Sequence, residues 1–334
     1  MAKCVMEVED QKLRAKLSST DSSSRSVENG NAQIPSVQKI WTIKEILDWS
    51  SHFLKKSGSP SSRLDVEILL SEVLSLKRID LYVSFDKPVY SIERNKFKNL
   101  LKRRANSEPI AYILGKKGFF GLDFHVTKDT LIPRPETEHL ISWIIEYISR
   151  TPDDACRRLL EIGSGSGCIA VSLAKNIEKV KVNAWELSSE AIKVSRQNAE
   201  THGVSEHIEF EKVDALDADN WKRDQDSETF YDLIVSNPPY VSEMDTCELA
   251  EETMKHEPSL ALFASNNGMK FYEVFAREAG KVLKPNAPIV LEIGFNQKKQ
   301  IMKLFENEGW NRVEVHRDYA GHPRVLIAFN SSQV

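Results

Sequence analysis

The feature that most constrains the fold is an apolar run that leads into a glycine-rich loop and then into a second apolar run. The stretch is LLEIGSGSGCIAVSLA at residues 159–174, with glycines at positions 163, 165 and 167. Its first part has the composition of a buried strand, and its last part has that of a helix. Glycines between the two allow the backbone to turn tightly and to approach a ligand closely. The stretch therefore predicts a strand–loop–helix unit with a ligand site at its turn.

From about residue 131 this alternation of strand and helix continues along the chain. Strands are expected at residues 158–163, 181–186, 207–213, 231–236, 287–293, 311–317 and 324–330. A helix is expected at residues 189–202, with Ser189 as its N-cap and Gly203 as its stop signal. The last two strands are joined by a short loop, so they are expected to pair antiparallel. The pattern predicts an α/β fold with a doubly wound, Rossmann-like sheet that ends in an antiparallel hairpin.

Three segments precede this α/β domain, which takes up residues 131–334. Residues 1–38 are rich in Ser, Asn and Glu without apolar periodicity, which is typical of a disordered extension. Residues 39–105 show helical periodicity after a Thr42–Glu45 capping box and predict a small all-α domain. Residues 106–130 alternate apolar side chains between glycines and predict a β-hairpin connector.

Charge, hydropathy and cysteine spacing exclude several kinds of protein. The 334 residues carry a net charge of −4, which does not suit strong electrostatic binding of nucleic acid by the whole surface. No apolar run approaches the roughly 20 residues that span a bilayer, so no membrane association is expected. The cysteines have neither disulfide nor metal-site spacing, which indicates reduced thiols of an intracellular protein and no bound metal. They are Cys4, Cys156, Cys168 and Cys247.

Two acids follow predicted strands on the same edge of the sheet as the glycine loop. Glu186 ends the second strand, 19 residues after Gly167, and an acid there can accept both ribose hydroxyls of an adenosine. Asp214 follows the third strand and can bond an adenine amino group, although a solvated loop acid is the alternative reading. The loop has GxGxG spacing rather than the GxGxxG of dinucleotide sites. The combination favours an adenosine with an uncharged linker, such as S-adenosylmethionine.

The fourth strand runs directly into Asn237-Pro238-Pro239-Tyr240. Since two prolines end a strand, a plain turn is one reading of this tetrapeptide. At the carboxyl edge of a doubly wound sheet, however, it suits chemistry on a planar –NH2 group. The side-chain oxygen of Asn237 and the carbonyl of Pro238 can each accept one N–H, and Tyr240 can stack on the planar group. Such a site needs neither a metal ion nor a covalent intermediate.

Together these motifs resemble the HemK/PrmC family, whose members are S-adenosylmethionine-dependent methyltransferases that modify the glutamine of the Gly-Gly-Gln motif in peptide-chain release factors. The likeness covers about residues 40–330. It rests on EPIAYILG (108–115), LIPRPETE (131–138), EIGSGSGCIAVSLA (161–174), VSNPPYV (235–241), HEPSLALF (256–263) and LEIG (291–294). The resemblance implies a class I methyltransferase sheet, S-adenosylmethionine as cofactor and a release factor as partner.

The resemblance also implies site residues. For the cofactor these are Gly163, Ser164, Gly165, Ser166, Gly167, Glu186, Asp214, Ala215, Asn237, Arg134 and Thr137. For the substrate glutamine they are Asn237, Pro238, Pro239 and Tyr240, of which Asn237, Pro238 and Tyr240 are the expected catalytic residues. Two positions depart from the family pattern. Glu186 stands where Asp is usual, and Ala215 stands where relatives can carry an aromatic residue, so a stacking contact with adenine is expected to be missing.

Two other functions fit parts of the pattern. An amino-group methyltransferase acting on adenine in DNA or RNA would use the same tetrapeptide on a flipped-out base, and would need a basic groove. A non-catalytic binding module on the same fold is the third class, and the intact Asn237 and glycine loop argue against it.

The resemblance, with the N-terminal domain and its extension, favours an organellar protein. The mitochondrion is the predicted location, with the cytoplasm as the alternative. A monomer without a stable nucleic-acid partner is expected. The helical domain is expected to recognise the release factor, first through a basic stretch made of Lys98, Lys102, Arg103 and Arg104.

Overall fold

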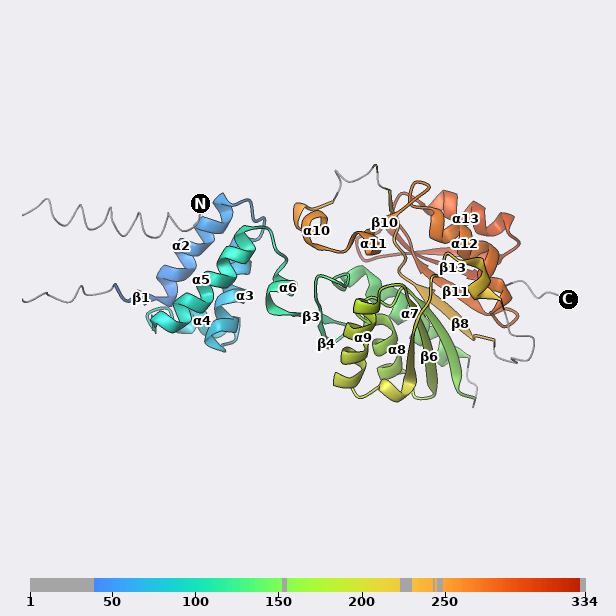
Figure 1. The fold of residues 1–334 in the computed structure, drawn as a ribbon, viewed down its shortest axis with the longest axis horizontal. Helices are drawn as coiled ribbons and strands as arrows, with labels where there is room; N and C mark the ends of the chain where they lie inside the picture. The colour runs from blue at the N-terminus through green and yellow to red at the C-terminus, as the bar shows by residue number, and fades with distance from the viewer. Residues whose placement is uncertain (1–38, 152–154, 223–229, 243, 245–248, 331–334) are drawn as a thin grey trace, which may run out of the picture. The chain divides into compact units, whose positions relative to one another are not determined.

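The computed structural model describes residues 39–151, 155–222, 230–242, 244 and 249–330 of the chain. The chain divides into two compact units, Met1–Asn106 and Ser107–Val334, whose elements are labelled in Figure 1. Residues 1–38 lie outside the described ranges, so the predicted disordered extension and the division into four segments stay predictions. Among the described residues, no helix is both long enough and apolar enough to cross a membrane.

The described part of the first unit contains the helices α2 (Ile43–Lys56), α3 (Ser62–Leu74), α4 (Arg78–Val83) and α5 (Ser91–Ala105). The predicted capping box starts α2: the Glu45 amide donates to Thr42 Oγ1 at 3.3 Å, and the Thr42 amide donates to Glu45 Oε2 at 3.0 Å. The unit is not purely helical, because β1 (Trp41–Thr42) pairs antiparallel with β2 (Pro88–Val89). A two-residue strand is too short to leave a sequence pattern.

A buried ion pair joins α3 to α5. Arg104 Nε donates to Asp65 Oδ2 at 2.7 Å, and each side chain is only 5% exposed. The hydroxyls of Ser59 and Ser61 also donate to the Asp65 carboxylate, at 2.7 and 2.9 Å. Arg104 is therefore a core residue, and the expectation that it contacts a partner as part of the basic stretch is wrong.

The connector at residues 106–130 is only partly a hairpin. Strands β3 (Lys116–Phe119) and β4 (Leu122–His125) pair antiparallel around a two-residue turn. Both turn residues have positive φ, 48° at Phe120 and 74° at Gly121, as a tight hairpin turn requires. Residues 110–114, expected as part of this hairpin, form the helix α6 (Ile110–Leu114) instead. Pro109 precedes its first turn, and Gly115 ends it in the left-handed conformation.

The second unit is built on one seven-stranded sheet. Its strands are β5 (Arg157–Ile162), β6 (Val180–Glu186), β7 (Ile208–Lys212), β8 (Leu233–Ser236), β11 (Pro288–Glu292), β12 (Asn311–Arg317) and β13 (Pro323–Phe329). They lie in the order β12-β13-β11-β8-β5-β6-β7. β13 pairs antiparallel with both β11 and β12, and the other neighbours are parallel. The predicted doubly wound sheet with its antiparallel terminal hairpin is confirmed.

Helices cover both faces of this sheet (Figure 1). One face packs against α7 (Glu138–Arg150), α8 (Cys168–Asn176) and α9 (Ser189–Thr201). The other packs against α12 (Lys270–Glu278) and α13 (Lys298–Asn307). Successive residues of a strand point to opposite faces of the sheet, so Leu159 and Leu160 of β5 pack into different cores.

Shorter elements connect these layers. They are η1 (Pro135–Thr137), η2 (Ser205–His207), η3 (Ala218–Trp221), β9 (Val241–Ser242), α10 (Glu251–His256), α11 (Ser259–Leu262), β10 (Phe263–Ala264) and η5 (Ala279–Lys281).

The predicted start of α9 is displaced by one residue. The N-cap is Ser188 rather than Ser189, since Ser188 Oγ accepts a hydrogen bond from the Ala191 amide at 3.2 Å. Either serine satisfies the sequence rule for a cap, and only the backbone decides between them. Gly203 follows the helix with a φ of 67°, which agrees with its predicted role as a stop.

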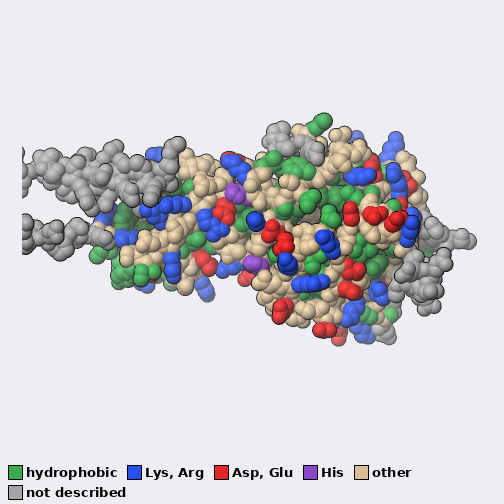
Figure 2. Space-filling view, in the orientation of Figure 1, with side chains coloured by type: hydrophobic (Ala, Val, Ile, Leu, Met, Phe, Trp, Pro, Cys, Tyr) green, Lys and Arg blue, Asp and Glu red, His purple; other side chains and the backbone are tan. Residues whose placement is uncertain are grey.

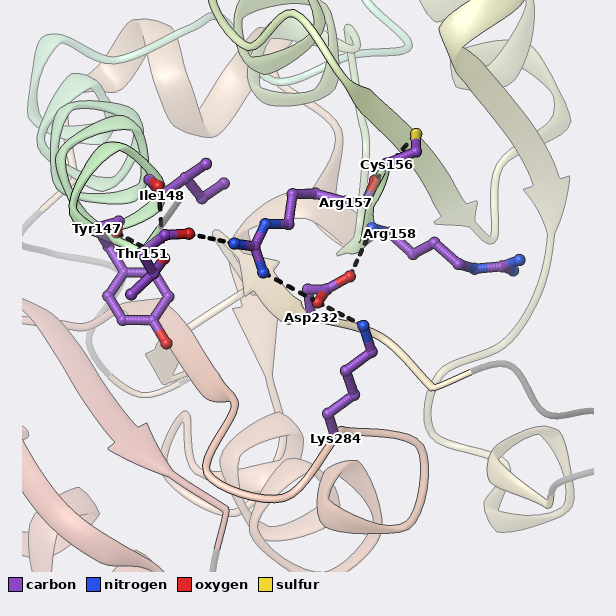
Figure 3. Close-up of polar contacts among 8 residues, drawn as sticks. All are labelled: Tyr147, Ile148, Thr151, Cys156, Arg157, Arg158, Asp232 and Lys284. Carbon is purple, nitrogen blue, oxygen red and sulfur yellow. Dashed lines mark hydrogen bonds and ion pairs between the residues drawn. The ribbon is translucent and has the colours of Figure 1, made fainter. Parts of the chain in front are cut away.

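A polar cluster holds the amino ends of β5 and β8 together, at the sheet edge opposite the glycine loop (Figure 3). The Asp232 carboxylate accepts from the Arg158 amide at 2.9 Å, from Lys284 Nζ at 2.7 Å and from Arg157 at 3.4 Å. Because a main-chain donor is among its partners, Asp232 fixes the register of the two strands.

Candidate active site

A cavity of about 580 Å³ lies at the carboxyl ends of the central strands of the second unit. Its walls come from the loops that follow β5, β6, β7 and β8, from η1 and the residues just before it, and from the segment of α11, β10 and the start of α12. The predicted site residues that line it are Gly163, Ser164, Gly165, Ser166, Glu186, Asp214, Ala215, Asn237, Pro238, Pro239, Arg134 and Thr137. Gly167 and Tyr240 do not line it. Segments more than 100 residues apart in sequence therefore meet at one place, as parallel strands dictate.

The glycines of the loop serve two purposes. All three have positive φ, 76° at Gly163, 54° at Gly165 and 77° at Gly167. A Cβ at Gly163 or Gly165 would meet nothing within 4 Å, whereas at Gly167 it would lie 2.9 Å from Cβ of Ser195. The first two glycines thus leave the backbone open to a ligand, and the third lets α8 pack closely on α9.

Glu186 ties the glycine loop to the start of α9. Its Oε2 accepts from the Gly165 amide and its Oε1 from the Ser188 amide, both at 2.9 Å. An ionised carboxylate has about four acceptor positions, so two of them remain for a ligand's hydroxyls. The side chain is therefore held in place at the cavity wall before any ligand binds.

The segment after β7 folds around a buried indole. Asp214 is exposed, and its Oδ1 accepts from the Leu216 amide at 2.9 Å. The carbonyl of buried Ala215 accepts from Trp221 Nε1, also at 2.9 Å. Trp221 is fully buried and meets Trp185 edge-on, with ring centroids 5.3 Å apart. The sequence alone predicts no role for Trp221, because a lone Trp in a polar segment carries no periodic signal.

The Asn-Pro-Pro-Tyr segment leaves two acceptors free. Asn237 Nδ2 donates to Thr137 Oγ1 at 3.1 Å. Among the described residues, no group donates to Asn237 Oδ1 or to the Pro238 carbonyl. The Tyr240 carbonyl is held by Gln297 Nε2 at 3.0 Å. Gly268 approaches the same carbonyl so closely that a Cβ there would lie 2.1 Å from the oxygen.

Behind these residues lies a buried acid that sequence analysis missed. Glu292, the last residue of β11, accepts from Thr137 Oγ1 at 2.6 Å and from the Tyr240 hydroxyl at 3.4 Å. Burial raises the pKa of the Glu292 carboxyl to about 6. A second missed acid, Glu257, accepts from Arg134 at 2.5 Å and from the Ile132 amide at 3.2 Å. It joins the LIPRPETE and HEPSLALF segments.

Glu161 is a third missed acid, and it lines the cavity. Its Oε2 accepts from the Ala170 amide at 3.1 Å, while its buried Oε1 has no partner among the described residues. Burial raises the pKa of this carboxyl well above its usual range. A signal was available: the tripeptide EIG occurs at 161–163 and again at 292–294, each time with an acid inside an apolar strand. A charge in such a place is costly unless a partner or a ligand meets it.

Two protein families match parts of the chain: the PrmC N-terminal domain matches residues 45–115, and the methyltransferase small domain matches residues 144–268. The release factor glutamine methyltransferase of Geobacter sulfurreducens is 38% identical over 288 residues, which cover 86% of this chain and 96% of that protein. The bifunctional methyltransferase of Rickettsia felis is 39% identical over 311 residues. That match covers 86% of this chain but only 58% of the Rickettsia protein.

Among solved structures, the catalytic domain of hMettl16 in complex with the MAT2A 3′UTR hairpin 1 has a TM-score of 0.50 and 18% identity, over 70% of this chain and 80% of that one. It shares the fold. The identity to the Geobacter protein, over nearly its whole length, confirms the resemblance read from the motifs. The chain belongs to the release factor glutamine methyltransferase family.

Proposed function

We propose that this protein transfers a methyl group from S-adenosylmethionine to the side-chain amide nitrogen of the glutamine in the Gly-Gly-Gln motif of a peptide-chain release factor. The observation that carries the proposal is the pair of free acceptors, Asn237 Oδ1 and the Pro238 carbonyl, beside a cavity with an adenosine-type loop. Two acceptors suit the two N–H groups of a primary amide.

The residues of the cavity fit S-adenosylmethionine. Acids outnumber cations in its wall, which suits a ligand with a sulfonium and an ammonium group; they are Asp129, Glu186, Glu190 and Asp214 against Arg134 and Lys270. Glu161 adds a carboxyl whose raised pKa disfavours its charged form. Glu161 Oε1 and the Ser164 hydroxyl are buried and have no partner among the residues that the structure describes, so they offer polar contacts to a ligand. When bound, this cofactor supplies an electrophilic methyl group.

The chain's own residues hold and orient the amide. Amide resonance opposes attack by the nitrogen, and its full loss costs about 18–20 kcal/mol, the barrier to peptide-bond rotation. Asn237 Oδ1 and the Pro238 carbonyl favour the positive charge that builds up on the nitrogen during attack. Tyr240 is the expected stacking face, a role that stays a prediction. Burial raises the pKa of the Cys168 thiol at the cavity to about 12, which disfavours its thiolate form.

The alternative, adenine in DNA or RNA as substrate, has less support. Nucleic acids need cations along the path of the phosphates, whereas acids outnumber cations in the cavity wall. The face drawn in Figure 2 carries acidic and basic side chains side by side, without a continuous basic stripe.

A methyl-transfer assay tests the proposal directly. The purified protein is given S-adenosylmethionine with a labelled methyl group and, in parallel, release factor, DNA and RNA. We expect label on the release factor alone, at the Gly-Gly-Gln glutamine. The Asn237→Ala variant should lose at least 100-fold in rate, as when a transition-state hydrogen bond is removed, and keep cofactor affinity within a few-fold. Label on nucleic acid but not on release factor would overturn the proposal.

The mitochondrial location is a separate proposal, which rests on the N-terminal domain and its Ser- and Asn-rich extension. A mitochondrial release factor would be the substrate if the predicted organellar location holds, and the protein would act as a monomer. Fractionation of cells that express the tagged full-length chain tests the location.

A further inference from the structure

We infer that Glu292 is a positioning residue: through the hydroxyl of Thr137, its carboxylate fixes which end of the Asn237 carboxamide is offered to the substrate. The inference rests on the proposed function, in which Asn237 Oδ1 accepts an N–H of the glutamine. It assigns a role to an acid that does not line the cavity.

The three residues form a hydrogen-bonded chain across three elements. Glu292 ends β11, Thr137 ends η1 and Asn237 follows β8. Thr137 Oγ1 lies 2.6 Å from Glu292 Oε2, and Asn237 Nδ2 lies 3.1 Å from Thr137 Oγ1. Glu292 is 1% exposed and Thr137 2%. Solvent therefore does not compete for the bond between Thr137 and Glu292, whereas the bond from Asn237 is partly buried at the cavity wall.

The number of protons available in this hydrogen-bonded chain determines which group donates and which accepts in each hydrogen bond. An ionised carboxylate only accepts hydrogen bonds, and a hydroxyl has a single proton to donate. Since Thr137 donates that proton to Glu292, its oxygen can only accept from Asn237. The only donor on the Asn237 side chain is Nδ2. The carboxamide must therefore turn Nδ2 toward Thr137, which leaves Oδ1 as the end free for a ligand.

The alternative orientation would defeat the proposed reaction. With the carboxamide reversed, Asn237 would present N–H donors to a substrate nitrogen that itself carries two N–H donors. The substrate would lose one of its two acceptors, and charge build-up on the nitrogen would be opposed. A hydroxyl alone allows both directions, because it can donate to Asn237 Oδ1 as readily as accept from Nδ2. The buried carboxylate removes that freedom.

Glu292 also accepts a hydrogen bond from the last residue of the Asn-Pro-Pro-Tyr segment. The Tyr240 hydroxyl donates to Glu292 Oε1 at 3.4 Å. Asn237 and Tyr240, the two ends of the Asn-Pro-Pro-Tyr segment, are thus both linked to one carboxylate, the first through Thr137 and the second directly.

Four variants test the inference by kinetics on a Gly-Gly-Gln peptide. Thr137→Val removes the hydroxyl and should lower kcat about tenfold or more, as loss of one oriented hydrogen bond does. Thr137→Ser restores a hydroxyl and should recover most of that loss. Glu292→Gln introduces a donor among the acceptors and should also lower kcat about tenfold. Cofactor affinity by calorimetry should stay within about twofold in Glu292→Gln, because Glu292 does not line the cavity. Thr201→Val, an exposed threonine of α9, is the matched control and should behave as wild type.

The double variant distinguishes an effect that Glu292 exerts through Thr137 from independent effects of the two residues on kcat. If Glu292 acts through Thr137, adding Glu292→Gln to Thr137→Val should cost little beyond Thr137→Val alone. Losses in kcat that multiply would overturn the inference, as would full activity of Thr137→Val.

A measurement without turnover keeps this inference distinct from the proposed function. The side-chain amide NMR signals of Asn237 are assigned by their absence in Asn237→Asp. They should be the same in wild type and Thr137→Ser, and should shift and exchange faster with solvent in Thr137→Val and Glu292→Gln. Unchanged signals in Thr137→Val would refute the positioning chain. Signals that respond in a protein that methylates no release factor would refute the proposed function alone.

Discussion

At the scale of single residues, Glu186 is an acid of the cavity wall that two main-chain amides hold in place. The family resemblance implies Asp at this position, and here Glu reaches both the Gly165 amide and the Ser188 amide. A side chain held at two points loses little further freedom when a ligand binds, so its hydrogen bonds to a ribose are made at low entropic cost.

Glu186→Ala should weaken binding of S-adenosylmethionine by roughly tenfold or more, because a hydrogen bond to a charged group contributes about 1.5–3 kcal/mol. Titration calorimetry measures the affinity. Glu200→Ala is the control, since Glu200 is an exposed acid of α9 that does not line the cavity. An affinity that Glu186→Ala leaves unchanged would remove Glu186 from the cofactor site.

Glu292 should reduce the stability of the folded protein at neutral pH. Burial raises the pKa of its carboxyl to about 6, from a usual value of 4.5. The folded protein therefore holds this proton more tightly than the unfolded chain, and the free energy of unfolding falls as pH rises from below 4.5 to above 6. The change is about 2 kcal/mol, at roughly 1.4 kcal/mol per pH unit.

The Gln side chain of Glu292→Gln does not titrate, so this variant should not lose the stability that wild type loses as pH rises. The difference in free energy of unfolding, variant minus wild type, should therefore be about 2 kcal/mol larger at pH 7.5 than at pH 4. Urea unfolding at both pH values measures the difference. The buried carboxyl of Glu161 titrates in both proteins and cancels. A difference that does not change with pH would show that folding does not raise the pKa of Glu292. Acids kept in place at a cost to stability are typical of functional sites.

At the scale of elements, periodic patterns in the sequence predict the strands of the sheet, whereas a helix or a contact that leaves no periodic pattern is missed. The strands of the sheet lie within two residues of their predicted positions, because apolar runs between helical periods mark buried parallel strands. The helix α6 was read as part of a hairpin, since five apolar residues fit a strand as well as a helical turn. The contact between Thr137 and Glu292 joins positions 155 residues apart. No local sequence pattern encodes such a pair, so the sequence alone does not predict the hydrogen-bonded chain from Glu292 to Asn237.

The ion pair between α3 and α5 gives a prediction for the first unit. Arg104→Ala leaves the Asp65 carboxylate buried without its cation, and loss of one partner of a buried pair costs about 3–5 kcal/mol. The melting temperature of the first unit should fall by several degrees. Lys102→Ala, on the same helix but only partly buried, should change it little. Equal melting temperatures for the two variants would mean that the pair adds nothing to the packing of the helices.

At the scale of the whole molecule, every residue that lines the cavity belongs to the second unit, Ser107–Val334. The glutamine side chain is small, and two acceptors cannot distinguish the glutamine of one protein from that of another. The choice of substrate must therefore use surface away from the cavity. The PrmC N-terminal domain family matches residues 45–115, and none of the described residues of the first unit lines the cavity, so we propose that the first unit makes that choice.

Truncation to residues 107–334 should separate chemistry from substrate choice. We expect the truncated protein to bind S-adenosylmethionine with nearly the affinity of the full chain and to methylate a short Gly-Gly-Gln peptide at a similar rate, because a peptide has no surface for the first unit to recognise. Its rate on intact release factor should fall by about 100-fold, as when contacts worth about 3 kcal/mol are removed from an interface. Circular dichroism and cofactor calorimetry establish that the fragment is folded. Lys98→Glu in the full chain, a charge reversal on α5, should raise the KM for release factor at low salt and less so at high salt, since rim charges act on association. If truncation instead slowed peptide and release factor by the same factor, the first unit would be supporting the fold of the second rather than choosing its substrate.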